Sequence, residues 1–279
     1  MICLIRFLLS CSLSTFLSVG SSPVHAQTSA QDSLSQQQYI VKDSLQPARL
    51  PPEKLNKDFV VTGIKDGVAI AASPLRWQKK DWLKFSALAG GVGGLMLLDK
   101  EIKSIFQHNQ NNFTSSVAPG VEPIGNIYGL FVFPAMYVTG LAIKNPHVES
   151  IGLRGSKAMA ISSIICFAGK NLIRRQRPDA ATTPFNYAPP FSKVKYSSFP
   201  SAHSSIAFTL ATAFAMEFPD KKWVAPVAYS IASLTALSRV YNNRHWASDI
   251  IVGAALGHFV TKAVYNRGQK KNRPAKTFM

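Results

Sequence analysis

The sequence predicts an all-α fold, a helical bundle of about five to six core helices that is embedded in a membrane. Apolar runs of helical length recur along the chain, without a convincing alternating strand pattern. Hydrophobic residues make up 47% of the 279 positions. Three groups of cationic, histidine and carboxylate side chains stand where apolar runs begin or end. We therefore expect the active site at helix ends.

The first 26 residues have the pattern of a secretory signal peptide. Arg6 precedes an apolar stretch at 7–19, and Ala26 provides a small residue at the expected cleavage point. An uncleaved membrane anchor is the alternative. Residues 27–56 are rich in Gln, Ser and Pro and predict a flexible exported leader.

Residues 57–110 predict an accessory helical region. The segment 58–72 is typical of an amphipathic helix that lies on a surface. The apolar run 85–97 contains four glycines, which weaken it as a helix. We expect this run to lie at an interface or to pack against the bundle rather than to cross a membrane.

Residues 111–266 predict the helical core. Its apolar runs cover 123–143, 158–169, 204–216, 223–238 and 250–261. A membrane span needs about 20 apolar residues, and only the first of these runs clearly reaches that length. The mean hydropathy of +0.07 is low for a membrane protein, so a soluble bundle with buried helices is the alternative.

A topology follows from the charges. The basic tail, 267–279, favours a cytoplasmic C-terminus under the positive-inside rule. If a cleaved signal leaves the mature N-terminus outside, an odd number of crossings is needed, and the five runs supply it. The segment 144–157 is then a cytoplasmic loop, and the site faces outward, toward the periplasm.

The composition narrows the partners. A formal net charge of +17 suits an anionic membrane surface, an anionic substrate or nucleic acid. Basic residues are not interleaved with aromatic ones, so we expect no nucleic-acid partner. Cys166 is the one cysteine beyond the signal, and the mature chain therefore has neither a disulfide nor a cysteine metal site.

The first polar group follows the run 158–169. Lys170, Arg174 and Arg177 have the spacing of one helical face, if the helix continues that far. Guanidinium groups bind phosphate oxygens at two points, and an ammonium acts as a point charge. The neighbouring Arg175 points elsewhere on such a helix and is interpreted as a membrane flank. A basic flank is the alternative for the whole group.

The second group stands at a helix start. Ser201 is a plausible N-cap after a proline, and Ala202 and His203 open the first turn. The free N–H groups of a first helical turn bind anions. A capping serine beside an incidental histidine is the alternative.

The third group joins two apolar runs. Arg239 ends one run, and His245 and Asp249 are four residues apart at the start of the next. On one helix face, the carboxylate can accept a hydrogen bond from one imidazole nitrogen and leave the other free to attack. A His–Asp pair that only caps a helix is the alternative.

Together the three groups resemble the signature of the type 2 phosphatidic acid phosphatase family. Its pattern of K-x6-R-P, P-S-G-H and S-R-x5-H-x3-D is matched at every spacing. Ala202 is the single departure, because the family has glycine there. Alanine keeps the N–H group, so anion binding survives if its φ is negative. The resemblance covers residues 120–265.

The resemblance implies a metal-independent phosphatase without a cofactor. His245 is the expected nucleophile that forms a phosphohistidine, Asp249 orients it, and His203 protonates the leaving oxygen. The expected phosphate-binding residues are Lys170, Arg177, Ser201, Ala202 and Arg239. A lipid phosphate in the inner membrane is the expected substrate, and undecaprenyl diphosphate, phosphatidic acid, phosphatidylglycerol phosphate and lipid A phosphates all fit.

Three other functions remain open at this point. Soluble periplasmic acid phosphatases of broad specificity have similar motifs and cleaved signals. Vanadium haloperoxidases share the site architecture, although this chain lacks their extra helical domain. A non-catalytic membrane protein that binds anionic lipid is the third alternative.

Overall fold

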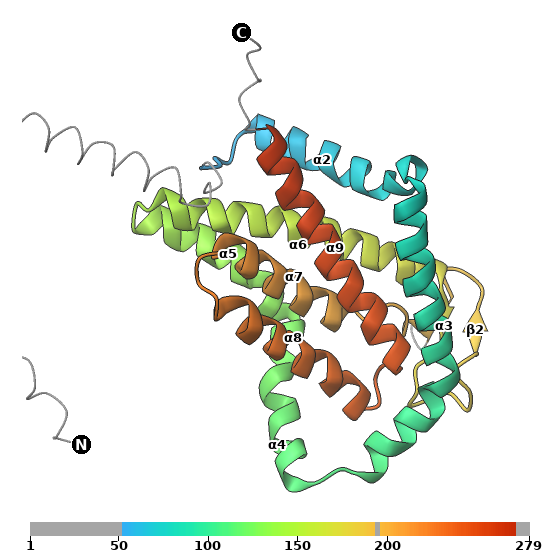
Figure 1. Cartoon of the computed structure of the whole chain (residues 1–279). Coiled ribbons are helices and arrows are strands. Elements are labelled where there is room, and N and C mark those ends of the chain that lie inside the picture. Colours follow the sequence, from blue (N-terminus) through green and yellow to red (C-terminus); the bar gives the residue numbers. More distant parts are fainter. Residues whose placement is uncertain (1–51, 193–195, 272–279) are drawn as a thin grey trace, which may run out of the picture. The chain divides into compact units, whose positions relative to one another are not determined.

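Helices make up almost all of the regular structure in the computed structural model, which confirms the all-α expectation (Figure 1). The structure describes residues 52–192 and 196–271. The expected signal peptide, most of the leader and most of the basic tail lie outside these residues. The described helices and strands are α2 (Lys57–Ala71), η1 (Ser73–Arg76), α3 (Lys79–His108), α4 (Asn112–Val121), η2 (Glu122–Gly125), α5 (Ile127–Ala142), α6 (Pro146–Leu172), β1 (Arg174–Arg175), β2 (Tyr187–Ala188), α7 (Ala202–Glu217), α8 (Val224–Tyr241) and α9 (Ala247–Lys271).

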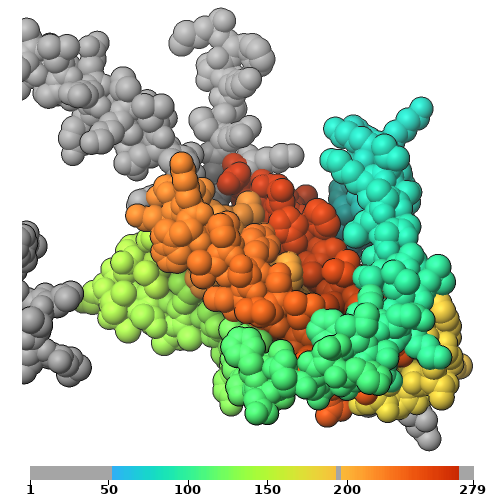
Figure 2. All heavy atoms as spheres, turned by 60° about the horizontal axis from the view of Figure 1, so that its bottom comes forward, coloured from blue at the N-terminus to red at the C-terminus, as the bar shows by residue number. Residues whose placement is uncertain are grey.

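Helix α7 is the centre of the core. It packs against α6, α8 and α9, and its residues 204–213 are buried almost without interruption. Phe133, Ile151 and Val264 are among the largest side chains that α5, α6 and α9 bury beside it. Figure 2 shows α8 and α4 on one face of the helical bundle, with α3 along the edge of that face.

Two glycines allow α7 and α9 to approach closely. A Cβ atom at Gly253 would lie 2.3 Å from the carbonyl oxygen of Ser201, and one at Gly257 would lie 2.3 Å from that of Ser205. Both distances are far below van der Waals contact, so only glycine fits. The start of α9 is therefore held directly against the start of α7.

The run 123–143 does not form one straight helix, contrary to the expectation. It is divided at Asn126, whose side chain caps α5 by accepting a hydrogen bond from the Ile127 N–H at 2.7 Å. The segment before the break, Asn112–Gly125, is inclined by 49° to α5. The extended backbone of Asn126 and its cap end one helical segment and begin the next.

The segment 144–157 was expected to be a loop, but most of it is helical, because α6 begins at Pro146. Asn145 caps this helix by accepting from the N–H groups of His147 and Val148, and Pro146 stands at its first position. The capping signal overrides the polar composition on which the loop was predicted.

Among the residues that the structure describes, two helices are long and apolar enough to cross a membrane, α6 and the Ala247–Gln269 part of α9, or three if the bent pair counts as one span. By length and composition, these helices are fewer than the five crossings expected from the sequence. Helix α7 has 16 residues, a length of about 24 Å, against about 30 Å of hydrocarbon.

Candidate active site

The ends of four helices supply the predicted site residues. Lys170 lies in the last turn of α6 and Arg239 in the last turn of α8. His203 lies in the first turn of α7 and Asp249 in the first turn of α9, and His245 just precedes α9. The polar residues of three distant sequence segments thus meet where the helices end.

The helical face predicted for Lys170, Arg174 and Arg177 does not exist, because α6 ends at Leu172. The two later arginines lie in β1 and in the loop after it. Lys170 and Arg177 nevertheless converge. Lys170 Nζ donates to the carbonyl oxygen of Ser197 at 2.8 Å, and Arg177 Nη2 donates to the hydroxyl of the same residue at 3.3 Å.

Unpaired donors remain on the cationic side chains. Within residues 52–192 and 196–271, the buried Nε atoms of Arg177 and Arg239 have no hydrogen-bond partner. Buried donors without partners are costly in folded proteins. Donors of this kind on guanidinium groups, including Nε of Arg174, are available to an anion.

The alanine at the family's glycine position fits an ordinary helix start. Ser201 caps α7, and its hydroxyl accepts from the N–H of Ser204 at 3.4 Å. Ala202 is the first helical residue and does not have a positive φ. The N–H of Ser201 donates to the carbonyl oxygen of Asp249 at 3.1 Å, which joins the starts of α7 and α9.

His245 and Asp249 face each other without a formed hydrogen bond. His245 Nδ1 and Asp249 Oδ2 are 3.7 Å apart, longer than a hydrogen bond but within ion-pair range. The same Oδ2 accepts from the hydroxyl of Ser198 at 2.5 Å and from the N–H of Trp246 at 3.0 Å. These donors fix the carboxylate beside the imidazole.

Arg175 was interpreted from the sequence as a membrane flank, and this is wrong. Its side chain is fully buried and lies between two carboxylates. Arg175 Nη1 donates to Asp249 at 2.7 Å, and Nη2 donates to Asp99 of α3 at 2.8 Å. Sequence reasoning missed Asp99 and Ser198 as well, because no local pattern links either residue to the motifs.

Burial and nearby cations lower the pKa of both histidines. Desolvation, together with Arg239, His245, Lys170 and Arg177, lowers the pKa of His203 to about 3. Desolvation also lowers the pKa of His245 to about 4, against the opposing effect of Asp249. Without substrate, both imidazoles are therefore neutral at pH 7.

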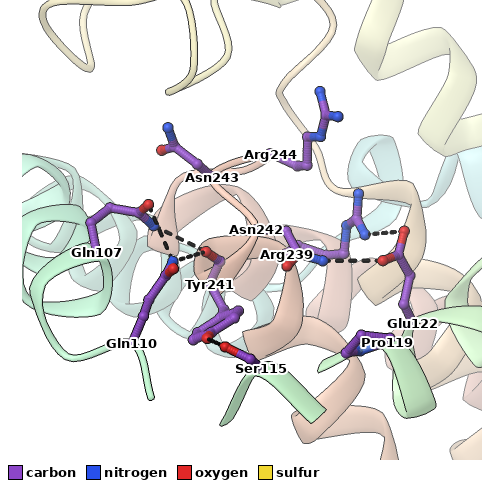
Figure 3. Close-up of a pocket in the computed structure, with 10 residues that line it drawn as sticks. All are labelled: Gln107, Gln110, Ser115, Pro119, Glu122, Arg239, Tyr241, Asn242, Asn243 and Arg244. Carbon is purple, nitrogen blue, oxygen red and sulfur yellow. Dashed lines mark hydrogen bonds and ion pairs between the residues drawn. The ribbon is translucent and has the colours of Figure 1, made fainter. Parts of the chain in front are cut away.

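A polar pocket of about 530 Å³ opens beside Arg239 (Figure 3). Arg239 Nη1 lies 2.5 Å from a carboxylate oxygen of Glu122, whose other oxygen accepts from Asn242 at 3.1 Å. On the opposite side of the pocket, the side-chain amides of Gln107 and Gln110 both donate to the backbone carbonyl oxygen of Tyr241. A candidate phosphate-binding arginine is thus engaged by a carboxylate before any ligand arrives.

An apolar cavity of about 250 Å³ lies on another side of the site. It extends from Lys170 and Ala202 between helices α5, α6 and α7. Its other lining residues are Leu130, Ser163, Cys166, Phe167, Ser205 and Ile206. The candidate site therefore lies beside a polar pocket and an apolar cavity.

Comparison with known proteins identifies the family. The model described as the PAP2 superfamily matches residues 156–273. Over this region the chain is similar to the PAP2 superfamily. The resemblance seen in the sequence is thereby confirmed, and α6 to α9 carry the PAP2 match.

Relatives of this chain are named as phosphatases. The lipid A 1-phosphatase of Porphyromonas gingivalis is 37% identical over 108 residues, which cover 38% of this chain and 21% of that protein. The undecaprenyl-diphosphatase of Sulfolobus acidocaldarius is 27% identical over 146 residues, which cover 50% of this chain and 69% of that protein. The chain thus spans about a fifth of the length of the first relative.

A solved structure shares the fold. The transmembrane PAP2 type phosphatidylglycerolphosphate phosphatase from Bacillus subtilis superposes with a TM-score of 0.53 and 25% sequence identity. The superposition covers 70% of this chain and 96% of that one. Almost the whole of that enzyme therefore corresponds to part of this chain.

Proposed function

We propose that this protein is a metal-independent phosphatase that hydrolyses a lipid phosphate or diphosphate through a phosphohistidine intermediate. The observation that carries the proposal is the convergence of two imidazoles and three cationic side chains where the ends of α6, α7, α8 and α9 meet the loop after β1. His203 is influenced electrostatically by Arg239, His245, Lys170 and Arg177 together, so all five groups share one neighbourhood. The names of the PAP2 relatives support a phosphatase.

The first chemical step follows from the two histidines. Nδ1 of His245 faces Asp249, so Nε2 is the nitrogen left to attack phosphorus. As the N–P bond forms, the bond from phosphorus to the ester oxygen breaks, and His203 gives its proton to that oxygen. Lys170, Arg177, Arg239 and the first-turn N–H groups of α7 stabilise the charge on the phosphoryl oxygens.

The second step returns the enzyme to its starting state. His203, now neutral, takes a proton from a water molecule whose oxygen attacks the phosphohistidine. The N–P bond breaks, inorganic phosphate leaves, and His245 is neutral again. Asp249 stabilises the imidazole while it carries positive charge.

A lipid substrate is supported by what surrounds the site. The apolar cavity beside Lys170 accommodates part of a hydrocarbon chain, and the polar pocket beside Arg239 accommodates a head group. Two helices of the bundle are long and apolar enough to span a bilayer. We place the enzyme in the inner membrane with its site facing the periplasm. Undecaprenyl diphosphate, phosphatidic acid, phosphatidylglycerol phosphate and lipid A phosphates are the candidate substrates.

The proposal is tested with purified full-length protein in detergent. Release of inorganic phosphate is measured from the four lipid phosphates and from soluble phosphate esters, with EDTA and without added metal. We expect turnover of at least one lipid phosphate, and loss of turnover to background in His245→Ala. A requirement for a divalent cation, or full activity of His245→Ala, contradicts the mechanism. Equal turnover of soluble esters favours a broad acid phosphatase instead.

A further inference from the structure

A buried chain of charges continues behind Asp249, on the side away from His245. Asp249 Oδ1 accepts from Arg175 Nη1 at 2.7 Å, and Arg175 Nη2 donates to Asp99 Oδ2 at 2.8 Å. The side chains of all three residues are 0% exposed. Helix α3, which carries Asp99, lies outside the segment that matches the PAP2 family model.

Ser248 holds Asp99 in one orientation. The N–H of Ser248 donates to Asp99 Oδ1 at 2.9 Å, and its hydroxyl donates to Asp99 Oδ2 at 2.5 Å. Arg175 Nη1 lies 2.7 Å from the same hydroxyl oxygen. Both oxygens of Asp99 are therefore engaged, and the carboxylate is fixed at the start of α9.

The charges of this chain decide how well Asp249 can assist His245. Asp249 and Arg175 alone sum to zero, so their combined field favours an imidazolium far less than a lone carboxylate does. Asp99 returns the sum to one negative charge. Because the residues are buried, water screens this charge poorly, and it acts on His245 from behind Asp249.

We propose that Asp99 is an electrostatic positioning residue of the active site, which offsets Arg175 so that Asp249 can stabilise the positive charge on His245. Arg175 fixes the orientation of Asp249, and Asp99 prevents Arg175 from cancelling its charge. The inference rests on the proposed nucleophilic role of His245.

Other charged and titratable groups near His245 are the same in every variant described below. Lys170 of α6 and Arg177 lower the pKa of His245, and Lys103 of α3 lies over the ring of Trp246 at 5.5 Å. Tyr187 of β2 is influenced electrostatically by Arg175, Asp249 and Asp99. None of these groups is altered, so a difference between variants reports the Asp99–Arg175 pair.

The first test is Asp99→Asn in the full-length protein. Asparagine removes one negative charge while Arg175 stays paired with Asp249, so no buried charge loses its partner. We expect kcat to fall about tenfold and the pKa of His245 in the kcat/KM profile to fall by roughly one unit, the order of effect of removing one buried charge that acts through Arg175 and Asp249. KM should change little. An unchanged kcat and pH profile overturns the proposal.

The double variant Asp99→Asn/Arg175→Met separates charge from structure. It restores a net charge of one negative through Asp249 alone, while Ser198 and the Trp246 N–H still hold that carboxylate. We expect most of kcat and the pH profile to return. If the pair matters only for packing, the double variant is as slow as the single one or slower, and the proposal fails. Should Asp99→Asn not fold, the double variant is compared directly with the wild type.

Glu217→Gln is the matched control. Glu217 forms an equally buried ion pair with Arg154 at 2.8 Å, formed between α6 and the end of α7. Its loss should lower the thermal unfolding midpoint without moving the pKa of His245. If the wild type hydrolyses no phosphate at all, the proposed function fails instead, and that result is distinct from an active Asp99→Asn with a wild-type profile.

Discussion

At the residue scale, the proposed mechanism needs the two histidines in opposite protonation states, whereas burial and nearby cations lower the pKa of both. Desolvation and neighbouring cations keep both neutral in the empty site. In the proposed mechanism, His245 is therefore in the protonation state needed to attack, whereas His203 lacks the proton that it would donate. A phosphate ester supplies what is missing, because its negative charge favours protonated His203 or because it arrives with a proton of its own.

This arrangement predicts a bell-shaped pH dependence of kcat/KM on the acid to neutral side. Activity falls below about pH 4 as His245 takes a proton and can no longer attack. It also falls above about pH 6, the second pKa of a phosphate monoester, because substrate and His203 together then lack the proton. Steady-state rates between pH 3 and pH 9 check this, and a rate that rises steadily into alkali contradicts it.

The Arg239–Glu122 pair leads to a second prediction. An incoming phosphate must compete with the Glu122 carboxylate for Arg239. The negative charge of Glu122 also repels the phosphate. We expect Glu122→Gln to lower the inhibition constants of inorganic phosphate and vanadate by about three- to tenfold, the size of a partly exposed ion pair. Glu101→Gln, on the exposed face of α3, is the control. Weaker inhibition of Glu122→Gln indicates that Glu122 organises Arg239 instead of competing for it.

At the scale of elements, the site depends on how closely α7 and α9 approach. Gly253 lies against the carbonyl oxygen of Ser201, the residue that caps α7. The backbone N–H of Ser201 also donates to the backbone carbonyl oxygen of Asp249, so the proposed phosphate-binding turn and the residue proposed to orient His245 are joined at this contact. A shift of the start of either helix therefore changes the positions of both Ser201 and Asp249.

Gly253→Ala should accordingly impair activity more than the small size of the added methyl group suggests. The new methyl group meets backbone rather than a flexible side chain, and overpacking of this kind costs about 1–3 kcal/mol. We expect a lower unfolding midpoint and weaker phosphate inhibition. Gly91→Ala is the control, because a Cβ at Gly91 meets nothing within 4 Å and alanine favours the helix by up to about 1 kcal/mol. Equal behaviour of the two variants contradicts the close-packing argument.

At the scale of the whole molecule, the central question is how a bundle with so few long apolar helices meets a membrane. Helices α6 and α9 qualify as spans, and α7 is short and largely buried between them and α8. Exposed apolar side chains are nevertheless frequent, for example Leu83 on α3, Phe131 on α5 and Phe167 on α6. Surfaces of this kind are unusual on soluble monomers and suit contact with lipid.

We therefore expect the protein to remain with membranes when cells are broken and washed in high salt, and to be released by detergent. Salt screens electrostatic attraction to anionic lipids but leaves apolar burial intact. Immunoblotting of the washed membranes and the supernatant measures the distribution. Recovery in the salt wash favours the soluble acid phosphatase instead.

The sequence by itself determined the helical class, the family and the residues that meet at the helix ends. Each of these depends on local patterns, namely apolar runs, a capping serine and fixed spacings within short segments. Lys170, Ser201, His245 and Asp249 could be found because each motif is contained in one stretch of chain.

Only the tertiary structure decided what lies behind and beside that site. Arg175 was interpreted as a flank because its partner Asp99 is 76 residues away, and no spacing rule connects them. The sequence also did not predict the ion pair between Glu122 and Arg239 or the break of the long apolar run at Asn126. Long-range ion pairs depend on how helices pack, and packing is a property of the whole bundle rather than of any one segment.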